Sequence, residues 1–221
     1  MHSYSFRVVA QSDHKLLEKI YRLRYQVYCH ECGFIKPEDH PKGLESDLYD
    51  PHSVHIVALD SKEEIVGTMR MILNHRYPLP IDQLCPELDY VEKKTPQFKT
   101  CEISRFIIRR KLDRQEQYGY HALAKHIFYG MCRHLYAQSV KRNMTHLLAL
   151  MEKRLGHLLK LYGIHISSIG EEVDYYGPVL PYVICLERSR GAILNYHLLR
   201  NIPLDDERIF FDKSSDIFAK S

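Results

Sequence analysis

Six charged residues are spaced so that they could form one buried ion network. They are the arginines Arg24, Arg70 and Arg105 and the acids Glu45, Asp47 and Asp50. Each arginine lies in or beside an apolar stretch, where an unpaired guanidinium is costly and a carboxylate can accept it through two hydrogen bonds. Such a network could do no more than fasten the acidic segment to the fold, or it could also form one wall of a substrate pocket.

These charges need a scaffold, and the hydrophobic periodicity predicts its elements. The helix that carries Arg24 repeats apolar residues at helical spacing, and two β-branched runs joined by a short polar turn are typical of a hairpin. The expected elements are a strand at 6–10, a helix from 12 or 13 to about 28, a loop at 29–51, hairpin strands at 54–59 and 65–73, an irregular segment at 74–100, a strand at 101–108, a helix from 119 to about 140, a strand at 145–151, a helix at 152–162, and strands at 165–169 and 179–186. This order predicts a single α/β (α+β) domain over residues 1–200, followed by an acidic tail at 201–221.

Composition restricts the class of protein. The chain has 221 residues, of which 45% are hydrophobic and 27% charged, as is ordinary for a globular protein. A net charge of +3 excludes a protein that coats polyanions, and we expect no nucleic-acid partner.

The sequence has no apolar run of membrane-spanning length and no signal-peptide pattern at its N-terminus. We therefore expect no membrane segment, a cytoplasmic location and reduced cysteines. The pair Cys29-x-x-Cys32 has no second ligand pair at zinc spacing, so no metal is expected.

The charged cluster resembles, in residue type and spacing, that of the acyl-homoserine-lactone synthase superfamily. The matching positions are Arg24-x3-Tyr28-x5-Phe34, Glu45-x-Asp47-x-x-Asp50, Arg70 and Glu102-Ile-Ser-Arg105. Longer phrases resemble a sister group more closely, the exosortase (PEP-CTERM) system-associated acyltransferases, which are similar to N-acyl amino acid synthases. These phrases are RYQVYCHECGF, GLESDLYDPHSVHIVA, IVGTMRMIL, LPIDQLCP, CEISRF, LALMEKRLGHLLKLYGI and YYGPVLPYVICL.

The resemblance implies a fold and a reaction. The fold is that of the Gcn5-related N-acyltransferases (GNAT), with a central mixed, mostly antiparallel sheet flanked by helices. The reaction moves a fatty acyl group from the phosphopantetheine of acyl-carrier protein to the amine of an amino acid, without a bound cofactor. An α-ammonium must lose a proton before it attacks a thioester, and the resemblance gives that base role to Glu102. It implies Glu102 and Arg105 as catalytic residues and Arg24, Tyr28, Phe34, Asp47, Asp50, Arg70 and Met151 as substrate-binding residues.

The spacing of Glu102 and Arg105 sets a geometric condition. Residues three apart on a regular strand point to opposite faces. For both to serve one cleft, the strand must bulge between them, and bulges are frequent beside active sites. The GNAT fold has such a bulge, and backbone N–H groups freed there can bind the thioester oxyanion.

The acyl donor is predicted from what is missing at the start of the long helix. Ordinary acetyl-CoA members of this fold carry Gln/Arg-x-x-Gly-x-Gly/Ala there and cradle the CoA pyrophosphate with backbone amides. Here the segment is Glu116-Gln-Tyr-Gly119-Tyr-His121, and one glycine remains. A carrier-bound phosphopantetheine needs only one phosphate held, which favours acyl-carrier protein. Carrier proteins are acidic, and the basic residues expected to bind one are Arg109, Arg110, Lys111 and Arg114, with Lys141, Arg142, Lys153 and Arg154 as additional candidates; the same run could be an ordinary solvated face.

Two other functions remain open at this stage. The first is an acyl-homoserine-lactone synthase that uses S-adenosylmethionine, although lactone synthases usually place Trp where this chain has Phe34, and the chain has no Trp. The second is a non-catalytic module that binds a carrier protein or nucleic acid. The presence of both Glu102 and Arg105 argues against the second.

Overall fold

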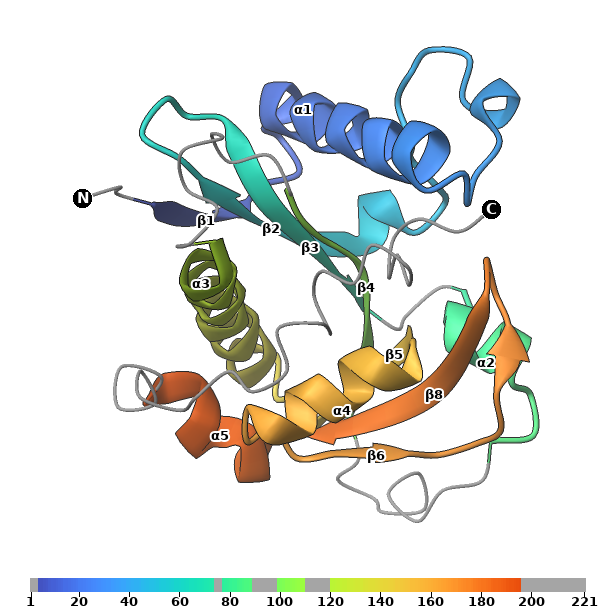
Figure 1. The fold of residues 1–221 in the computed structure, drawn as a ribbon, viewed down its shortest axis with the longest axis vertical. Helices are drawn as coiled ribbons and strands as arrows, with labels where there is room; N and C mark the ends of the chain where they lie inside the picture. The colour runs from blue at the N-terminus through green and yellow to red at the C-terminus, as the bar shows by residue number, and fades with distance from the viewer. Residues whose placement is uncertain (1–3, 74–76, 89–98, 110–119, 196–221) are drawn as a thin grey trace. The chain divides into compact units, whose positions relative to one another are not determined.

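The structure is a computed structural model that describes residues 4–73, 77–88, 99–109 and 120–195 (Figure 1). Its strands and helices are β1 (Ser5–Val9), α1 (His14–Tyr25), β2 (Ser53–Leu59), β3 (Ile65–Leu73), α2 (Pro80–Leu84), β4 (Thr100–Ile108), α3 (Tyr120–Lys141), β5 (His146–Met151), α4 (Lys153–Leu161), β6 (Ile166–Ser168), β7 (Val173–Asp174), β8 (Pro178–Cys185) and α5 (Leu186–Leu194). The strands form one mixed sheet in the order β1-β2-β3-β4-β5-β8-β6, with β7 paired to β8. Within the described residues, no helix has the length and hydropathy needed to span a membrane.

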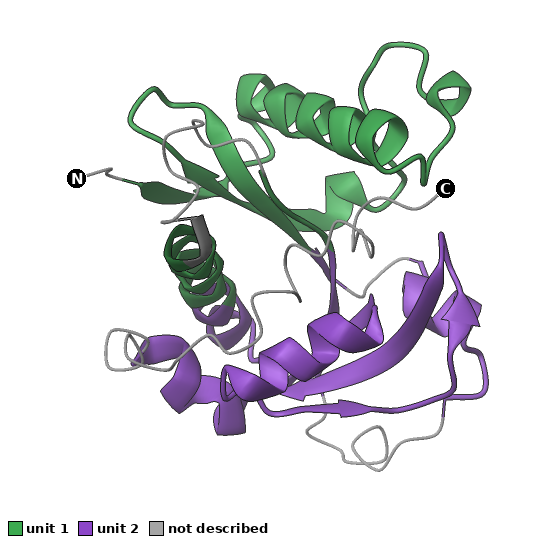
Figure 2. Ribbon diagram, in the orientation of Figure 1, with its two compact units in different colours: residues 1–70, 105–135, 218–221 green, residues 71–104, 136–217 purple. Residues whose placement is uncertain are grey.

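The chain divides into two compact units (Figure 2). Among the described residues, unit 1 holds 4–70, 105–109 and 120–135, and unit 2 holds 71–73, 77–88, 99–104 and 136–195. A unit boundary falls inside β3, β4 and α3, so these three elements belong to both units.

Two strands of unit 1, β2 and the part of β3 that belongs to it, are buried on both faces. All seven residues of β2 are buried, and β1 pairs antiparallel to it, from Ser5 opposite Leu59 to Val9 opposite His55. α1 packs Leu17 and Ile20 against this sheet, where they join a cluster with apolar residues of β2 and β3. α3 covers strands of the same unit closely, since a Cβ on Gly130 would lie 2.0 Å from the Phe6 ring of β1. Strands covered by helices in this way read as continuous apolar runs rather than as alternating ones.

Unit 2 is built around β5, which has neighbours of both orientations. It runs parallel to β4, with Thr100 opposite His146, and antiparallel to β8, with Met151 opposite Leu180. α4 approaches β8 so closely that a Cβ on Gly156 would lie 2.6 Å from the Tyr182 ring. The sheet is therefore mixed and mostly antiparallel, and the predicted α/β fold class is confirmed.

The predicted elements are largely present, and the differences have local causes. The expected hairpin is β2–β3, closed by a turn in which the Asp60 N–H donates to the Glu64 carbonyl at 3.0 Å. α1 does not run regularly to Tyr28 but gives way to a π-helical turn, η1 (Gln26–Glu31). The loop predicted after it also contains two 3-10 turns, η2 (Pro37–Asp39) and η3 (Asp50–His52).

Two short helices were not predicted. α2 lies inside the segment expected to be irregular, and its five residues start at a proline, which is compatible with a first helical position. α5 directly follows β8, where we expected only the end of a strand. Its buried face includes Ser189, which weakens the apolar pattern that would have indicated a helix.

Candidate active site

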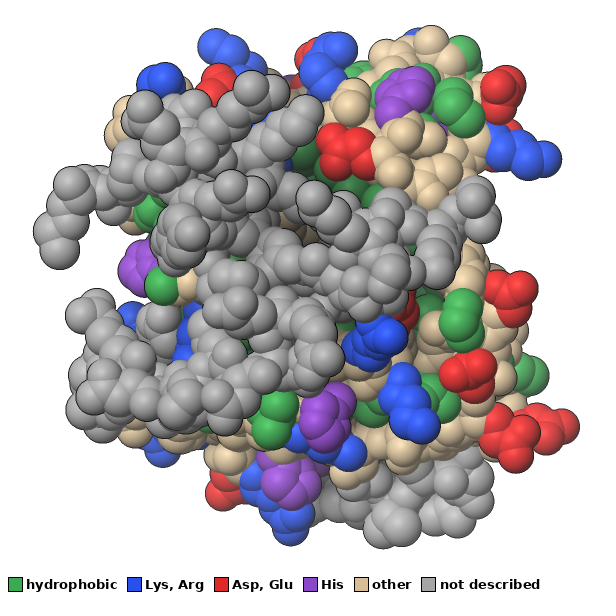
Figure 3. All heavy atoms as spheres, in the orientation of Figure 1, with side chains coloured by type: hydrophobic (Ala, Val, Ile, Leu, Met, Phe, Trp, Pro, Cys, Tyr) green, Lys and Arg blue, Asp and Glu red, His purple; other side chains and the backbone are tan. Residues whose placement is uncertain are grey.

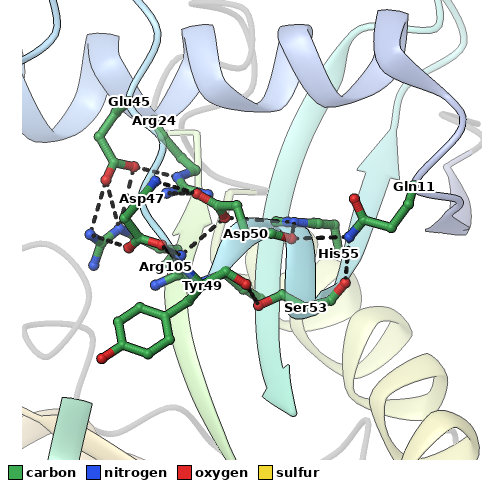
Figure 4. Close-up of polar contacts among 10 residues, drawn as sticks. Gln11, Arg24, Glu45, Asp47, Tyr49, Asp50, Ser53, His55 and Arg105 are labelled. Atoms are coloured by element: carbon green, nitrogen blue, oxygen red, sulfur yellow. Dashed lines mark hydrogen bonds and ion pairs between the residues drawn. The ribbon is translucent and has the colours of Figure 1, made fainter. Parts of the chain in front are cut away.

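Asp50 is the centre of a buried ion network in unit 1 (Figure 4). Arg24 Nη1 donates to Asp50 Oδ1 at 2.6 Å and Nη2 donates to Oδ2 at 3.1 Å, while Arg70 Nη1 donates to Oδ1 at 3.0 Å. The Arg24 side chain is 0% exposed, and those of Asp50 and Arg70 are 2% exposed. Charged groups this deeply buried must be paired, and the contacts pair each of these three.

Glu45 is the second buried carboxylate and joins two arginines. Arg24 Nε donates to Glu45 Oε2, and Arg105 donates to Oε1 from Nε at 3.1 Å and from Nη2 at 2.9 Å. The Glu45 side chain is 1% exposed. The guanidinium of Arg24 thus bridges Glu45 and Asp50, and Glu45 links it to β4.

Asp47 and Arg105 form the outer end of the network. Arg70 Nη1 donates to Asp47 Oδ1 at 2.6 Å, and Arg105 Nη2 donates to Oδ2 at 3.3 Å. The exposed fractions are 26% for the Asp47 side chain and 14% for that of Arg105. The loop holds Asp47 through its backbone, because the Asp47 N–H donates to Asp50 Oδ2 at 2.7 Å. A polar ligand can therefore reach the network at this pair.

The arginines keep the buried acids ionised. Burial opposes ionisation of Glu45, but Arg24 and Arg105 outweigh it and lower its pKa to about 2. Burial likewise opposes ionisation of Asp50, and Arg24 with Arg70 holds its pKa well below the ordinary range. The network pairs three guanidiniums with three carboxyl groups, so its formal charges balance.

His55 lies beside the inner end of the network, and its importance was not predicted. Its Nε2 lies 3.4 Å from the Asp50 carbonyl oxygen and 3.6 Å from Asp50 Oδ1. Both atoms are acceptors, so Nε2 carries the ring hydrogen. Burial lowers the pKa of His55 to about 4, with Asp50 opposing this shift and Arg24 and Arg70 adding to it. His55 is therefore neutral at pH 7 and leaves the charge balance unchanged.

Gln11 fastens the segment that contains Asp50. Its Nε2 donates to the Asp50 carbonyl at 3.0 Å and to the Ser53 carbonyl at 2.8 Å. A glutamine in a polar turn has no sequence signal for such a role. These two hydrogen bonds hold η3 and the start of β2 against the turn that follows β1. They thereby fix the position of the Asp50 carboxylate.

Tyr28 and Phe34 are brought to Arg105 by the π-helical turn. The Arg105 guanidinium carbon lies 5.5 Å from the Tyr28 ring centre, and the Tyr28 and Phe34 rings stack with centres 6.4 Å apart. Burial raises the pKa of Tyr28 to about 12, so its hydroxyl keeps its proton and can donate weakly to the Phe106 carbonyl at 3.5 Å. These aromatic rings border the outer pair of the network.

The backbone of β4 is left-handed at Arg105. Its φ is +51°, an uncommon value for a residue with a side chain and the conformation found at the first residue of one class of bulge. The regular alternation of side chains therefore does not hold across residue 105. That Glu102 and Arg105 serve one cleft stays a prediction.

Glu102 belongs to unit 2, where it is 2% exposed. Its Oε2 accepts a hydrogen bond from the Ile81 N–H at 2.9 Å. Met151, at the end of β5, is also in unit 2 and is partly buried. The structure thus brings Arg24, Asp47, Asp50, Arg70 and Arg105 together, whereas the convergence of Glu102 and Met151 with them stays a prediction. Among the residues expected to bind a carrier protein, Arg109 is exposed at the end of β4, and Arg110, Lys111 and Arg114 lie outside the described residues.

Part of the chain matches a known protein family. Residues 23–122 match the family model of the acetyltransferase (GNAT) domain, a segment that holds the whole ion network and Glu102. This part of the chain is therefore similar to the GNAT domain. A search of curated proteins found no significant match to the sequence.

Solved structures support the GNAT fold over most of the chain. The CoA-dependent acyl-homoserine lactone synthase BjaI, solved with SAM and isopentyl-CoA, has a TM-score of 0.69 at 18% identity, with 91% of each chain covered. The acyl-homoserine lactone synthase LasI has a TM-score of 0.64 at 18% identity, covering 88% of this chain and 95% of LasI. FeeM, an N-acyl amino acid synthase from uncultured soil microbes, has a TM-score of 0.55 at 16% identity, covering 90% of this chain and 99% of FeeM. The chain therefore shares its fold with acyl-homoserine lactone synthases and with an N-acyl amino acid synthase.

Proposed function

We propose that this GNAT acyltransferase moves a fatty acyl group from acyl-carrier protein to the amine of an amino acid. The observation that supports this acceptor is the partly exposed pair of Asp47 and Arg105, at the end of an otherwise buried network whose formal charges balance. A zwitterion can place its α-ammonium against Asp47 and its α-carboxylate against Arg105 without unbalancing the buried charges. An amine without a carboxylate would bring an uncompensated positive charge to the same place.

The reaction requires a neutral amine. In the proposed mechanism Glu102 takes a proton from the α-ammonium, and the free amine attacks the thioester carbonyl carbon. Backbone N–H groups beside the left-handed Arg105 stabilise the oxyanion of the tetrahedral intermediate. The nitrogen of this intermediate then loses a second proton to solvent, and collapse breaks the C–S bond to leave the neutral amide. The proton taken by Glu102 passes to the departing thiolate.

The surface of α4 supports an acidic donor such as a carrier protein. Its exposed polar side chains are Lys153, Arg154, His157 and Lys160, and the helix contains no acid. Figure 3 shows lysine, arginine and histidine side chains gathered where α4 lies in Figure 1. Such a face attracts an acidic partner and speeds its association at low salt. Acyl-CoA is the competing donor, because the neighbours BjaI and MesI are CoA-dependent.

An acyl-homoserine-lactone synthase is the second candidate function. The observation that favours it is the fold shared with BjaI, which was solved with SAM. S-Adenosylmethionine also carries an α-ammonium and an α-carboxylate, so the pair of Asp47 and Arg105 suits it as well. The two candidates differ in product, since only the lactone synthase closes a ring.

The test is a thiol-release assay with acyl-carrier protein as donor. An amino acid, the amine that lacks its α-carboxylate, and S-adenosylmethionine are compared as acceptors, and mass spectrometry identifies each product. We expect an N-acyl amino acid and little turnover of the amine.

Asp47→Asn should raise the KM for the amino acid about 10- to 100-fold, because a charged hydrogen bond to the α-ammonium is lost. The control is Asp39→Asn, since Asp39 is exposed in the same loop. Turnover with S-adenosylmethionine alone, giving a lactone, would contradict the proposal and support the second candidate.

Two further expectations belong to this proposal. An association with an exosortase system follows only from the resemblance of the sequence phrases, and it is tested by the identity of the acylated product in an expressing host. A cytoplasmic location agrees with a carrier-protein donor and with the six free cysteines, Cys29, Cys32, Cys85, Cys101, Cys132 and Cys185.

A further inference from the structure

A hydrogen bond joins Glu102 to the first turn of α2, and both lie in unit 2. The Ile81 N–H donates to Glu102 Oε2 at 2.9 Å. Glu102 is 2% exposed and Ile81 is 0% exposed. A buried carboxylate and a buried amide each require a polar partner, so one contact satisfies both groups.

The sequence of α2 makes this donor available. Leu79 occupies the N-cap position and has no side-chain oxygen with which to cap the helix. Pro80 follows and has no N–H, so Ile81 is the first residue of the helix that can donate. The next two amides, of Asp82 and Gln83, donate to the Leu79 carbonyl at 3.0 and 3.2 Å. Glu102 therefore supplies, from β4, the acceptor that the N-cap residue lacks.

We propose that the Ile81 amide is a positioning group for proton transfer at Glu102, holding the carboxylate in place and favouring its ionised, proton-accepting form. This inference rests on the proposed function, in which Glu102 takes the ammonium proton. A hydrogen bond donated to a carboxylate stabilises the ionised form over the neutral one. The amide touches the base and not the substrate, so its effect reaches the reaction only through Glu102.

The charge of Glu102 also acts on two thiols, and neither can replace the amide. Cys85 follows α2, and burial raises its pKa, with the Glu102 charge adding to the shift. Cys101 precedes Glu102 in β4, and burial raises its pKa to about 12, opposed by Arg142 and assisted by Glu102. Both thiols therefore stay protonated and uncharged at neutral pH, and they do not titrate where a carboxylate does.

The test replaces single amides of α2 by esters in the otherwise intact chain. Exchanging Ile81 for its α-hydroxy acid keeps the side chain and removes only the N–H. The matched control makes the same exchange at Gln83, whose N–H donates to the backbone carbonyl of Leu79. The rate of thiol release is measured against pH at saturating donor, with melting curves for both proteins.

We expect the acid limb of the rate profile to move about 1–2 pH units upward in the Ile81 ester and to stay in place in the Gln83 ester. At pH above the limb, the Ile81 ester should recover to within a few-fold of the parent. If the Ile81 ester does not fold, Glu102→Asp withdraws the carboxylate from Ile81 by one methylene and should also move the limb upward.

The outcomes separate this inference from the function on which it rests. Coincident acid limbs in the two esters overturn the positioning role, if Glu102→Gln still abolishes most of the turnover. A Glu102→Gln protein that keeps its turnover and its acid limb overturns the proposed base itself, and the positioning role with it.

Discussion

Arg24 binds Asp50 end-on, with Nη1 donating to Oδ1 at 2.6 Å and Nη2 donating to Oδ2 at 3.1 Å. Neither side chain is more than 2% exposed. This geometry suits the planar fork of arginine, and a lysine could not reproduce it. The pair ties α1 to the acidic loop, and Arg70 extends the tie to β3.

The first prediction concerns the energy of this buried pair. Asp50→Asn removes the central negative charge and leaves Arg24 and Arg70 undercompensated in the interior. We expect the free energy of unfolding to fall by about 3–5 kcal/mol. The measurement is denaturant unfolding, with Glu18→Gln as control, because Glu18 pairs with Arg22 on the surface of α1 and should cost no more than about 1 kcal/mol. Similar losses in the two variants would contradict a special role for the buried network.

The second prediction concerns acid stability. His55 has a pKa lowered from 6.5 to about 4, so the unfolded chain binds this proton more readily than the folded protein. Stability should therefore fall as the pH drops from about 6.5 to 4. Glu45 and Asp50, also with lowered pKa values, add a second loss as the pH falls from about 4 toward 2.

His55→Gln tests the upper part of this profile. Glutamine keeps a donor for Asp50 but does not titrate, so the loss between pH 6.5 and 4 should become smaller. His157→Gln, on the exposed face of α4, should leave the profile of the parent unchanged. The measurement is the free energy of unfolding at several pH values, and a profile unaffected by His55→Gln would show that another group causes the loss.

The third prediction concerns Glu102 as base. Glu102→Gln keeps the size of the side chain but cannot take the ammonium proton, so turnover should fall about 10²- to 10⁴-fold. The acid limb of the rate profile should disappear, while the affinity for the donor changes little. Glu87→Gln, exposed in the same unit, is the control. If the variant instead loses thermal stability and keeps its pH profile, Glu102 has a structural role only.

The fourth prediction concerns the donor. Charge reversal at Lys153, Arg154 and Lys160 should raise the KM for acyl-carrier protein, and the effect should fade at high salt. Reversal at Arg109, Arg110 and Arg114 should act in the same direction. Arg22→Glu on α1 is the control, since Arg22 is exposed in unit 1 and away from α4 in sequence. Equal, salt-insensitive rates with acyl-CoA and acyl-carrier protein would show that the degenerate Gly119 segment had been misinterpreted.

The network could be predicted because burial and charge were both visible in the sequence. Arg24 stands in an apolar periodicity and Arg70 in a β-branched run, and acids were available between them. The elements that carry them were predicted for the same reason, since periodicity indicates which residues are buried. The family resemblance then identified this order of strands and helices as that of the GNAT fold.

The remaining features arise from contacts that leave no local pattern. The π-helical turn that places Tyr28 under Arg105 differs from an α-helix by one hydrogen-bond step. The environment of His55 is set by residues from three elements, and that of Glu102 by a backbone amide 21 residues away. Such contacts depend on tertiary packing, so they cannot be predicted from the type of a residue and its neighbours in the sequence.

The network also has a consequence for how the chain folds as it is synthesised. Glu45 forms ion pairs with Arg24, which precedes it in the sequence, and with Arg105, which follows it by 60 residues. Arg105 is added 35 residues after Arg70, a delay of about 2–7 s at ordinary rates of translation. During that interval the nascent chain contains the three loop acids but only two of the three arginines that pair with them. The incomplete network therefore has a net negative charge. β4 carries the missing guanidinium, that of Arg105. We therefore expect the acidic loop to reach its final, fully paired position only after β4 has left the ribosome.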